Sequence, residues 1–228
     1  MTVLRKIARL AALAAVAALA GCGNETDQGL VYKSVLQGLS QNSGQTMSAM
    51  APEQTAAAVQ ASLAQTDLPL ALAVVEKRQA TAILANIETN GAYRTWGTSD
   101  RRTVTTAQGL VTATRGLGND IMSSSVSQVA ALVTGRKAGT GRRVMRYLDG
   151  ENHTVEIASD CRIARGGQKR VSSGTIQNVL VTEMSEICSM SGGKSFSNSY
   201  LVDGRGRVLA SRQWLGEANG YIALQLLR

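Results

Sequence analysis

The sequence predicts a mainly β protein, in which one curved antiparallel sheet forms a sandwich or an open barrel with one or two N-terminal or inserted helices against it. Hydrophobic and polar residues alternate with a period of two after Pro69, as in residues 153–163 (HTVEIASDCRI). The chain has only 2 prolines, and neither follows residue 69, which suits long uninterrupted strands. Turn-forming pairs separate the alternating stretches and lie at Asn90-Gly91, Asp149-Gly150, Asp203-Gly204 and Asn219-Gly220.

The best helix candidate is residues 52–69. Pro52 suits the first turn, Glu53 lies near the positive end of the helix dipole, and Pro69 lies beyond the end. The alanine-rich sides of this segment favour packing on a sheet. Residues 32–39 (YKSVLQGL) could form a short first helix.

Residues 94–121 read as strand, turn, strand, tight turn, strand and then a glycine-rich stop. Residues 119–134 form either a helix or a long crossing loop. Near the end of the chain, residues 221–228 (YIALQLLR) place Ile222, Leu224 and Leu226 on one side of a strand.

The N-terminus reads as an export signal. Arg5, Lys6 and Arg9 precede an apolar core at residues 10–20, and about 20 such residues would be needed to span a bilayer. Leu19-Ala20-Gly21-Cys22 resembles the bacterial lipobox, which predicts a signal peptide at residues 1–21 and a lipidated Cys22. The alternative is an ordinary secretory signal with a chance cysteine.

The lipobox interpretation divides the chain into three parts. Residues 22–33 would be a tether, and residues 34–228 a single β-rich periplasmic domain. Acyl chains on Cys22 would hold the protein on lipid, at about 0.8 kcal/mol per buried CH2. Gly23, in place of an aspartate, favours the outer membrane in enteric bacteria. The expected location is therefore the outer membrane, with the domain facing the periplasm.

The charge balance excludes nucleic acid as the expected partner. The chain has 24 Lys and Arg against 16 Asp and Glu, and 21 basic residues remain without the three in the signal, an excess of 5. This modest and diffuse excess suits acidic lipid head groups or an acidic polymer.

Two cysteines remain once Cys22 is lipidated. Cys161 and Cys188 would lie in an oxidising compartment, which predicts a disulfide; two buried free thiols are the alternative. No metal or other cofactor is expected, because His153 is the only histidine and no Cys-x-x-Cys motif is present.

The residues do not predict an enzyme. His153 lies on the apolar side of the 153–163 pattern, where it is expected to be a partly buried structural residue and not a catalytic base. No Walker loop is present. Hydrolysis of a glycoside needs two facing carboxylates, and no spacing pairs those available. These are Asp100, Asp120, Glu156, Asp160, Glu183 and Glu186.

Three groups of residues are candidate contact sites. Arg115, Gly116, Gly118 and Asp120 combine charge with glycine in a turn, which suits either a ligand site or a helix cap with a local pair. Trp96 and Trp214 could present aromatic faces to sugar or pack in the core. Residues 134–143 (TGRKAGTGRR) are expected to form an exposed basic loop that touches lipid phosphates or acidic polysaccharide, or is merely solvated. Its basic residues are Arg136, Lys137, Arg142 and Arg143.

Three stretches together resemble the YjbF family of outer-membrane lipoproteins, also called the GfcB-like family. In residues 94–121 the matching positions are Trp96, Gly109, Thr114, Arg115, Gly116, Leu117, Gly118 and Asp120. A second set is Glu186, Cys188, Phe196, Asn198 and Tyr200, and a third is Ser211, Arg212, Gln213 and Trp214. Leu201 departs from the pattern, because members often have tryptophan there.

The resemblance implies a non-enzymatic accessory lipoprotein in exopolysaccharide or capsule secretion or assembly. Its partners would be polysaccharide or export-channel proteins. One alternative is a periplasmic carrier of lipid or lipoprotein, which needs an apolar cavity. Another is a polysaccharide-modifying enzyme, which needs two carboxylates facing each other in a groove.

Overall fold

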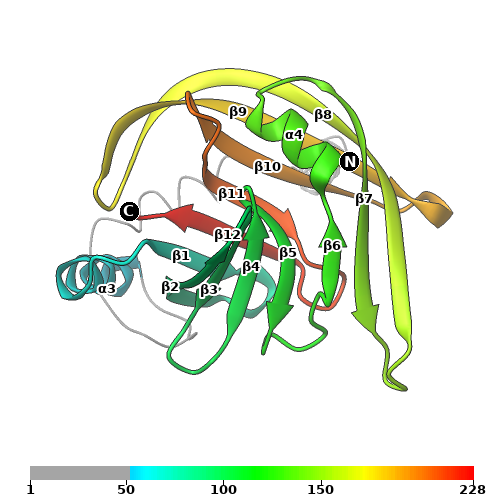
Figure 1. Ribbon diagram of the computed structural model, residues 1–228, viewed down its shortest axis with the longest axis horizontal. Helices are drawn as coiled ribbons and strands as arrows, with labels where there is room; N and C mark the ends of the chain where they lie inside the picture. Colours follow the sequence, from blue (N-terminus) through cyan, green and yellow to red (C-terminus); the bar gives the residue numbers. More distant parts are fainter. Residues whose placement is uncertain (1–51) are drawn as a thin grey trace, which may run out of the picture. The chain divides into compact units, whose positions relative to one another are not determined.

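The computed structural model describes residues 52–228 (Figure 1). The expected signal peptide, Cys22, the tether and the helix at residues 32–39 lie outside the described residues. The helical elements are α3 (Pro52–Gln65), η1 (Glu76–Arg78), α4 (Ser127–Thr134) and η2 (Ser191–Gly193). The first six strands are β1 (Leu70–Val75), β2 (Ala80–Asn90), β3 (Tyr93–Gly97), β4 (Thr103–Ala107), β5 (Leu110–Arg115) and β6 (Ser123–Ser125). The others are β7 (Gly139–Leu148), β8 (Thr154–Ser173), β9 (Ile176–Met190), β10 (Ser195–Asp203), β11 (Val208–Trp214) and β12 (Tyr221–Leu226).

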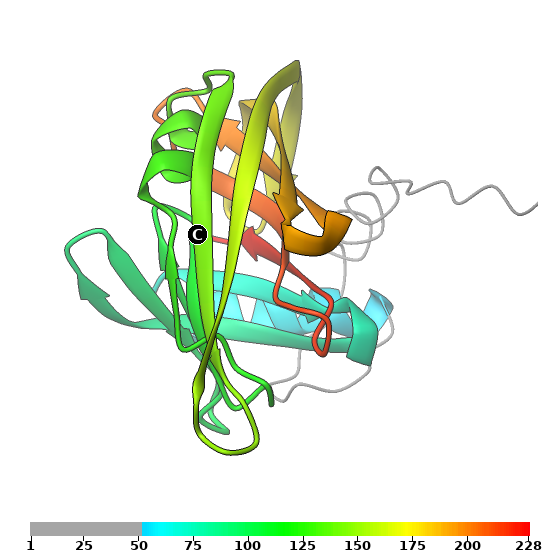
Figure 2. The same cartoon turned by 90° about the vertical axis from the view of Figure 1, so that its right-hand side faces the viewer.

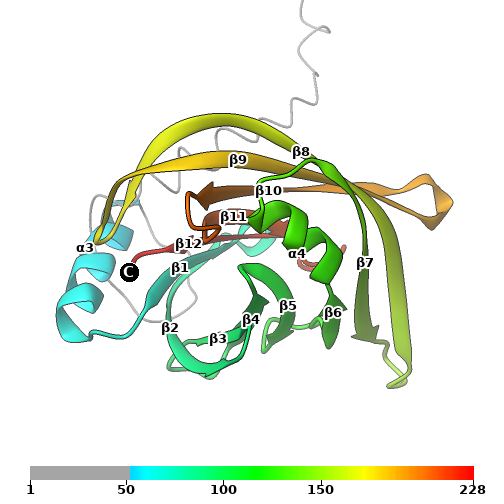
Figure 3. The ribbon, with the colours of Figure 1, turned by 45° about the horizontal axis from the view of Figure 1, so that its top comes forward.

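All strands belong to one 12-stranded antiparallel sheet in the order β5-β4-β3-β2-β1-β12-β11-β10-β9-β8-β7-β6. The two edge strands, β5 and β6, are neighbours in sequence. Beside them the amide of Thr114 donates to the carbonyl of Ile121 at 3.0 Å. Figure 3 shows the strands following one another around a ring. The sheet is therefore a nearly closed barrel, which confirms the open-barrel alternative.

Strand β1 is buried on both faces, which explains its unbroken apolar sequence LALAVV. Its alternate residues Ala71, Ala73 and Val75 face the main core inside the barrel. Leu70 and Leu72 point outward and belong to a second cluster that includes Ala58 and Val59 of α3. Burying an aliphatic side chain of this size stabilises the fold by about 1.5–3 kcal/mol, so α3 is fixed to the outside of the sheet.

The helix predicted for residues 52–69 is confirmed as α3, which ends at Gln65. It stops short of Leu68 because the ring of Pro69 disfavours helical geometry in the preceding residue.

The 119–134 segment is part strand and part helix. Residues 123–125 pair with β7 as β6, and α4 begins only at Ser127. Val129, Ala130 and Val133 of α4 are buried in the main core. Figure 3 shows α4 inside the ring of strands, so this helix fills part of the barrel interior.

The four predicted turn pairs all lie between consecutive strands. The strand, turn, strand, tight turn, strand order of residues 94–121 is also confirmed, as β3, β4 and β5. At the tight turn Gly109 has φ +88°, and a Cβ there would lie 2.5 Å from Cβ of Val208. Only glycine allows this turn to approach β11 so closely.

Strands β8 and β9 are long and form an arched ribbon, clearly seen in Figures 1 and 2. Ser159, Cys161 and Ile163 face the interior as the alternation predicts. The expectation for His153 was wrong: the hairpin extends into solvent there, and the His153 side chain is 70 % exposed. It pairs with Asp149 at 3.3 Å and Glu151 at 3.6 Å.

Candidate functional site

A buried ion pair lies inside the barrel. Arg143 Nε donates to Glu186 Oε1 at 3.0 Å, and Arg143 Nη2 donates to Glu186 Oε2 at 3.1 Å. Oε2 also accepts from the Tyr200 hydroxyl at 2.5 Å and from Asn198 Nδ2 at 2.8 Å. Arg143 Nη2 further donates to the Tyr200 oxygen at 3.1 Å. We call these four residues the interior polar cluster; none is more than 1 % exposed.

Strand register brings the cluster together. Glu186 of β9 lies directly opposite Asn198 of β10, and Tyr200 lies two residues further along β10 on the same face. Arg143 comes from β7 and reaches across β8 to Glu186. Because a buried carboxylate is costly unless paired and hydrogen-bonded, the four side chains form one interdependent unit.

Burial and charge shift the ionisation of the cluster. Burial alone would lower the pKa of Arg143, but the attraction of Glu186 outweighs it and the pKa is raised. Burial and the negative charge of Glu186 raise the pKa of Tyr200 well above its ordinary value. Arg143 therefore stays charged and Tyr200 stays protonated at neutral pH.

The predicted disulfide Cys161–Cys188 is confirmed and lies beside this cluster. The two cysteines are directly opposite each other on β8 and β9, and the Cys188 sulfur lies 3.1 Å from Glu186 Oε1. The two sulfurs and Glu186 are close enough together to hold a metal ion. With the sulfurs bonded to each other, however, the group offers no thiolate ligand.

The four basic residues of 134–143 do not form one exposed loop, contrary to the prediction. Arg142 and Arg143 belong to β7, and because strand residues alternate between faces, Arg142 is exposed whereas Arg143 is buried. Arg136 is half-buried and its Nη1 donates to the Asp203 carbonyl at 2.7 Å. Lys137 is exposed in the turn before β7.

Arg115, Gly116, Gly118 and Asp120 come together in the loop that joins the two edge strands. Asp120 accepts from the Thr114 hydroxyl at 2.8 Å and from the amide of Gly116 at 2.8 Å. Arg115 Nη1 donates to the Ile121 carbonyl at 3.0 Å. Asp120 thus organises this loop and does not cap a helix. The contacts are structural ones that close the barrel seam.

The two tryptophans lie in different places. Trp96 is buried, and its Nε1 donates to Thr106 Oγ1 at 3.1 Å. Trp214 stacks on Phe196 with ring centroids 4.5 Å apart, and its backbone amide donates to Asn198 Oδ1 at 2.8 Å. Both rings therefore pack in the protein, and each also lines a cavity: Trp214 one beside β8 and β9, and Trp96 a different one.

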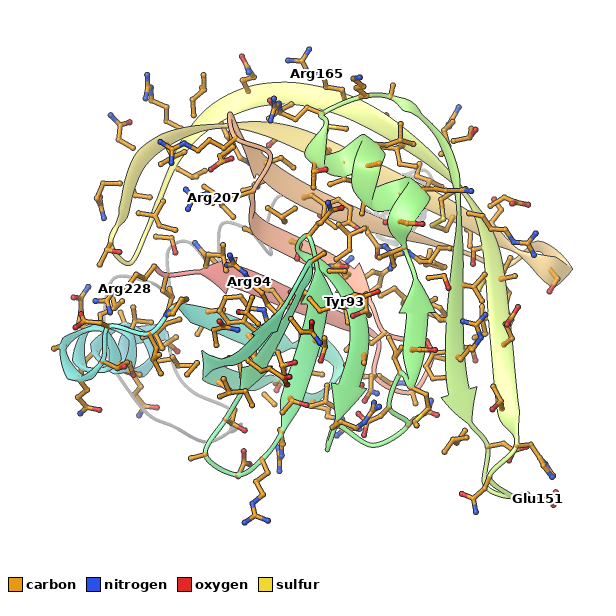
Figure 4. All side chains as sticks on the ribbon, in the orientation of Figure 1. Tyr93, Arg94, Glu151, Arg165, Arg207 and Arg228 are labelled. Carbon is orange, nitrogen blue, oxygen red and sulfur yellow. A yellow bond between two sulfur atoms is a disulfide. The ribbon has the colours of Figure 1, made fainter. Side chains whose placement is uncertain are left out.

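That cavity, of about 530 Å³, lies at one end of the barrel, and we call it the barrel mouth. Strands β1, β3, β4, β11 and β12, the C-terminal end of α4 and three hairpin turns surround it. Arg94, Arg205 and Arg207 are its charged lining residues, and none of its described lining residues is a carboxylate. Figure 4 shows Arg94 and Arg207 coming from different walls, β3 and the β10–β11 turn.

Asp203 holds the β10–β11 turn below the mouth. Its carboxylate accepts from the amides of Arg205 at 2.9 Å and Arg207 at 2.8 Å, and from Arg207 Nε at 2.8 Å. Burial would raise the pKa of Asp203, but these hydrogen bonds, led by that of the Arg207 side chain, lower it below the ordinary value. Asp203 therefore holds the backbone of Arg205 and both the backbone and the side chain of Arg207.

The sequence does not identify the three arginines as a group. They come from segments more than a hundred residues apart and carry no motif. The sequence of the turn, GRGRV, indicates the turn but not which wall it faces.

A family model described as group 4 capsule polysaccharide lipoprotein gfcB, YjbF matches residues 33–227. The chain belongs to the YjbF family. In this YjbF-family chain, the family resemblance includes Glu186, Cys188, Asn198 and Tyr200. Glu186, Asn198 and Tyr200 belong to the interior polar cluster, and Cys188 belongs to the disulfide beside it.

Among solved structures, the chain is similar to the crystal structure of the hypothetical lipoprotein YmcC from Escherichia coli (K12). The TM-score is 0.63 at 18 % identity, covering 75 % of this chain and 86 % of that one. This likeness supports the fold. No curated protein matches the chain significantly. Within residues 52–228, no helix has the length and apolarity needed to cross a membrane.

Proposed function

We propose that this YjbF-family protein is a non-enzymatic accessory factor in capsule or exopolysaccharide secretion or assembly at the outer membrane. The observation that carries the proposal is the match of residues 33–227 to a family whose description names a capsule polysaccharide lipoprotein. In this proposal, residues 34–228 form a single β-rich domain that contacts polysaccharide or a protein of the export channel.

The proposed anchor is lipid on Cys22 after removal of residues 1–21. The short apolar core and the Leu-Ala-Gly-Cys sequence support it. Two or three acyl chains suffice for stable membrane attachment. Residues 22–33 would then keep the domain close to the inner surface of the outer membrane.

A role without catalysis agrees with how the carboxylates are used. Glu186 is fully buried, and Arg143, Tyr200 and Asn198 hydrogen-bond to its oxygens. Asp120 is occupied by loop contacts, and Glu183 pairs with Lys169 at 2.5 Å. A carboxylate engaged in this way is a poor general acid or nucleophile.

The test is deletion of the gene, with polysaccharide measured separately on the cell surface and in the medium. We expect less surface polymer in the deletion strain and restoration by the wild-type chain. A Cys22→Ala chain should restore little, because it lacks the anchor. Mass spectrometry of the mature wild-type protein should show an acylated Cys22 as the first residue. Normal polymer after deletion would contradict the function, and a bare or internal Cys22 would contradict the anchor.

A further inference from the structure

We propose that the barrel mouth binds a carboxylate-bearing sugar unit of an acidic polysaccharide. This inference rests on the proposed function and deepens it by assigning the site and the chemical class of the ligand. The mouth has the features of a small-ligand site. Its volume of about 530 Å³ lies within the range of about 300–1,000 Å³ usual for such sites, and barrel mouths are a common place for them.

Charge at the mouth selects an anion. Arg94 and Arg205 are exposed, and among residues 52–228 neither side chain has an ion pair or hydrogen-bond partner. Arg207 adds a third guanidinium, held by Asp203 Oδ2 at 2.8 Å. Guanidinium groups bind carboxylates with two parallel hydrogen bonds, and such charge-assisted bonds are about twice as strong as neutral ones.

The end of α4 opposes an anion at the mouth only weakly, because three of its last four carbonyls already have partners in the protein. A helix C-terminus carries partial negative charge on its last carbonyls. Here the carbonyls of Ala131, Leu132 and Val133 accept from the backbone amides that follow the helix, at 2.9–3.1 Å. Their negative ends are therefore already hydrogen-bonded within the protein.

The walls favour a sugar over an acyl chain. Apolar surface from Trp96, Val208, Leu224 and Leu226 suits the C–H faces of a sugar ring. Between these side chains lie hydroxyl and amide groups that can bind ring hydroxyls; they belong to Thr106, Gln108, Thr134 and Ser211. The hydroxyls of Thr106, Thr134 and Ser211 each have one partner within the protein and keep capacity for a second hydrogen bond. A sugar hydroxyl can make that second bond, as it can with the exposed Gln108 amide, whereas an acyl chain cannot.

The probe is trigalacturonic acid, with neutral maltotriose as its uncharged comparison, measured by isothermal titration calorimetry on the folded protein. We expect trigalacturonic acid to bind, maltotriose to bind at least tenfold more weakly, and affinity for the acidic sugar to fall as salt rises. The Arg94→Gln/Arg205→Gln variant should bind about tenfold or more weakly.

The matched control is Arg162→Gln/Arg165→Gln, which removes the same charge from exposed positions on β8. Figure 4 shows Arg165 on the crest of the arch, away from Arg94 and Arg207. It should change affinity less than twofold. A second mouth variant, Ala131→Glu, leaves all the arginines in place, adds a negative charge at an exposed position of α4, and should also weaken binding.

Absence of binding, equal binding of maltotriose, or an equal loss in the control variant would overturn the inference. Binding of dodecanoate but not of trigalacturonic acid would also overturn it and would favour a lipid carrier. Failure of this inference is separate from failure of the proposed function. If the deletion strain loses surface polymer but the protein does not bind trigalacturonic acid, the proposed function stands and the proposed site is wrong.

Discussion

Gln213 of β11 reaches across the barrel to Val111 of β5, whose backbone amide donates to Gln213 Oε1 at 2.9 Å. Gln213 Nε2 donates in turn to the carbonyl of Gly109 at 2.9 Å. Strand β5 is an edge of the sheet, and edge strands have backbone groups without a strand partner. One glutamine side chain thus satisfies a backbone amide of the edge strand and a carbonyl of the turn before it, and connects both to β11.

Gln213→Leu should therefore loosen β5. It leaves the Val111 amide and the Gly109 carbonyl without these partners, and we expect the free energy of unfolding to fall by about 1–3 kcal/mol. Amide hydrogen exchange at Val111 should become faster than at core positions of β10. The exposed Gln177→Leu is the control and should change stability by less than about 0.5 kcal/mol. Unchanged protection at Val111 would contradict this role.

The interior polar cluster makes a prediction about stability. Arg143→Met should cost about 3–5 kcal/mol in urea unfolding, because it leaves the Glu186 carboxylate buried without its cation. Adding Glu186→Leu should recover part of that loss. Ser159→Ala is the control: Ser159 lies opposite Arg143, and its hydroxyl has no hydrogen-bond partner among the described residues. If Arg143→Met cost no more than this control, the cluster would not be an interdependent unit.

The disulfide should stabilise the fold mainly through the unfolded chain. It joins residues 27 apart, for which chain entropy predicts about 3.5 kcal/mol. Cys161→Ser/Cys188→Ser should lower the free energy of unfolding by about that amount. Reductant should destabilise the wild type and leave the variant unchanged. Equal sensitivity of both proteins to reductant would show that the bond does not have this role.

Asp203 makes a prediction about pH. Its folded-state pKa is lowered, so its contribution to stability is fully present above the unfolded-state value of about 3.9. The contribution is lost as the pH falls from about 4 through the folded pKa. Asp203→Asn should cost about 1–3 kcal/mol at pH 7, because three hydrogen bonds to the carboxylate are weakened.

The difference between Asp203→Asn and wild type should shrink as the pH falls below 4. Asp67→Asn is the control, because that side chain is fully exposed and its contact with Arg228 is 3.7 Å long. A difference that stays constant between pH 7 and pH 3 would show that Asp203 is not ionised differently in the folded and unfolded states.

The local features of the fold were predictable from the sequence. Alternation, the Asn-Gly and Asp-Gly pairs and the position of Pro69 each act over a few residues, and the structure confirms the strands, turns and helix end that they predict. The sequence alone could not distinguish a closed barrel from a sandwich. Closure depends on the two edges of the 12-stranded sheet, β5 and β6, lying next to each other.

Among the candidate residues, too, local patterns were predictable and long-range positions were not. Cys161 and Cys188 could be paired because only two cysteines remained after Cys22. Arg143 was misplaced because the sequence of residues 134–143 looks like a loop, whereas residues 139–148 pair with β8 and point alternate side chains inward. His153 was misplaced for the opposite reason, because the alternating pattern continues past the point where β8 leaves the core. The three mouth arginines lie close together only because the strands that carry them form one barrel.

The most direct test of the account is surface polysaccharide in the deletion strain carrying one of three chains: wild type, Arg94→Gln/Arg205→Gln or Arg162→Gln/Arg165→Gln. Membrane levels of the three proteins should first be shown to be equal. We predict that the wild type and the Arg162/Arg165 variant restore the polymer and that the mouth variant restores little. Full restoration by the mouth variant, or normal polymer in the strain without any chain, would contradict the account.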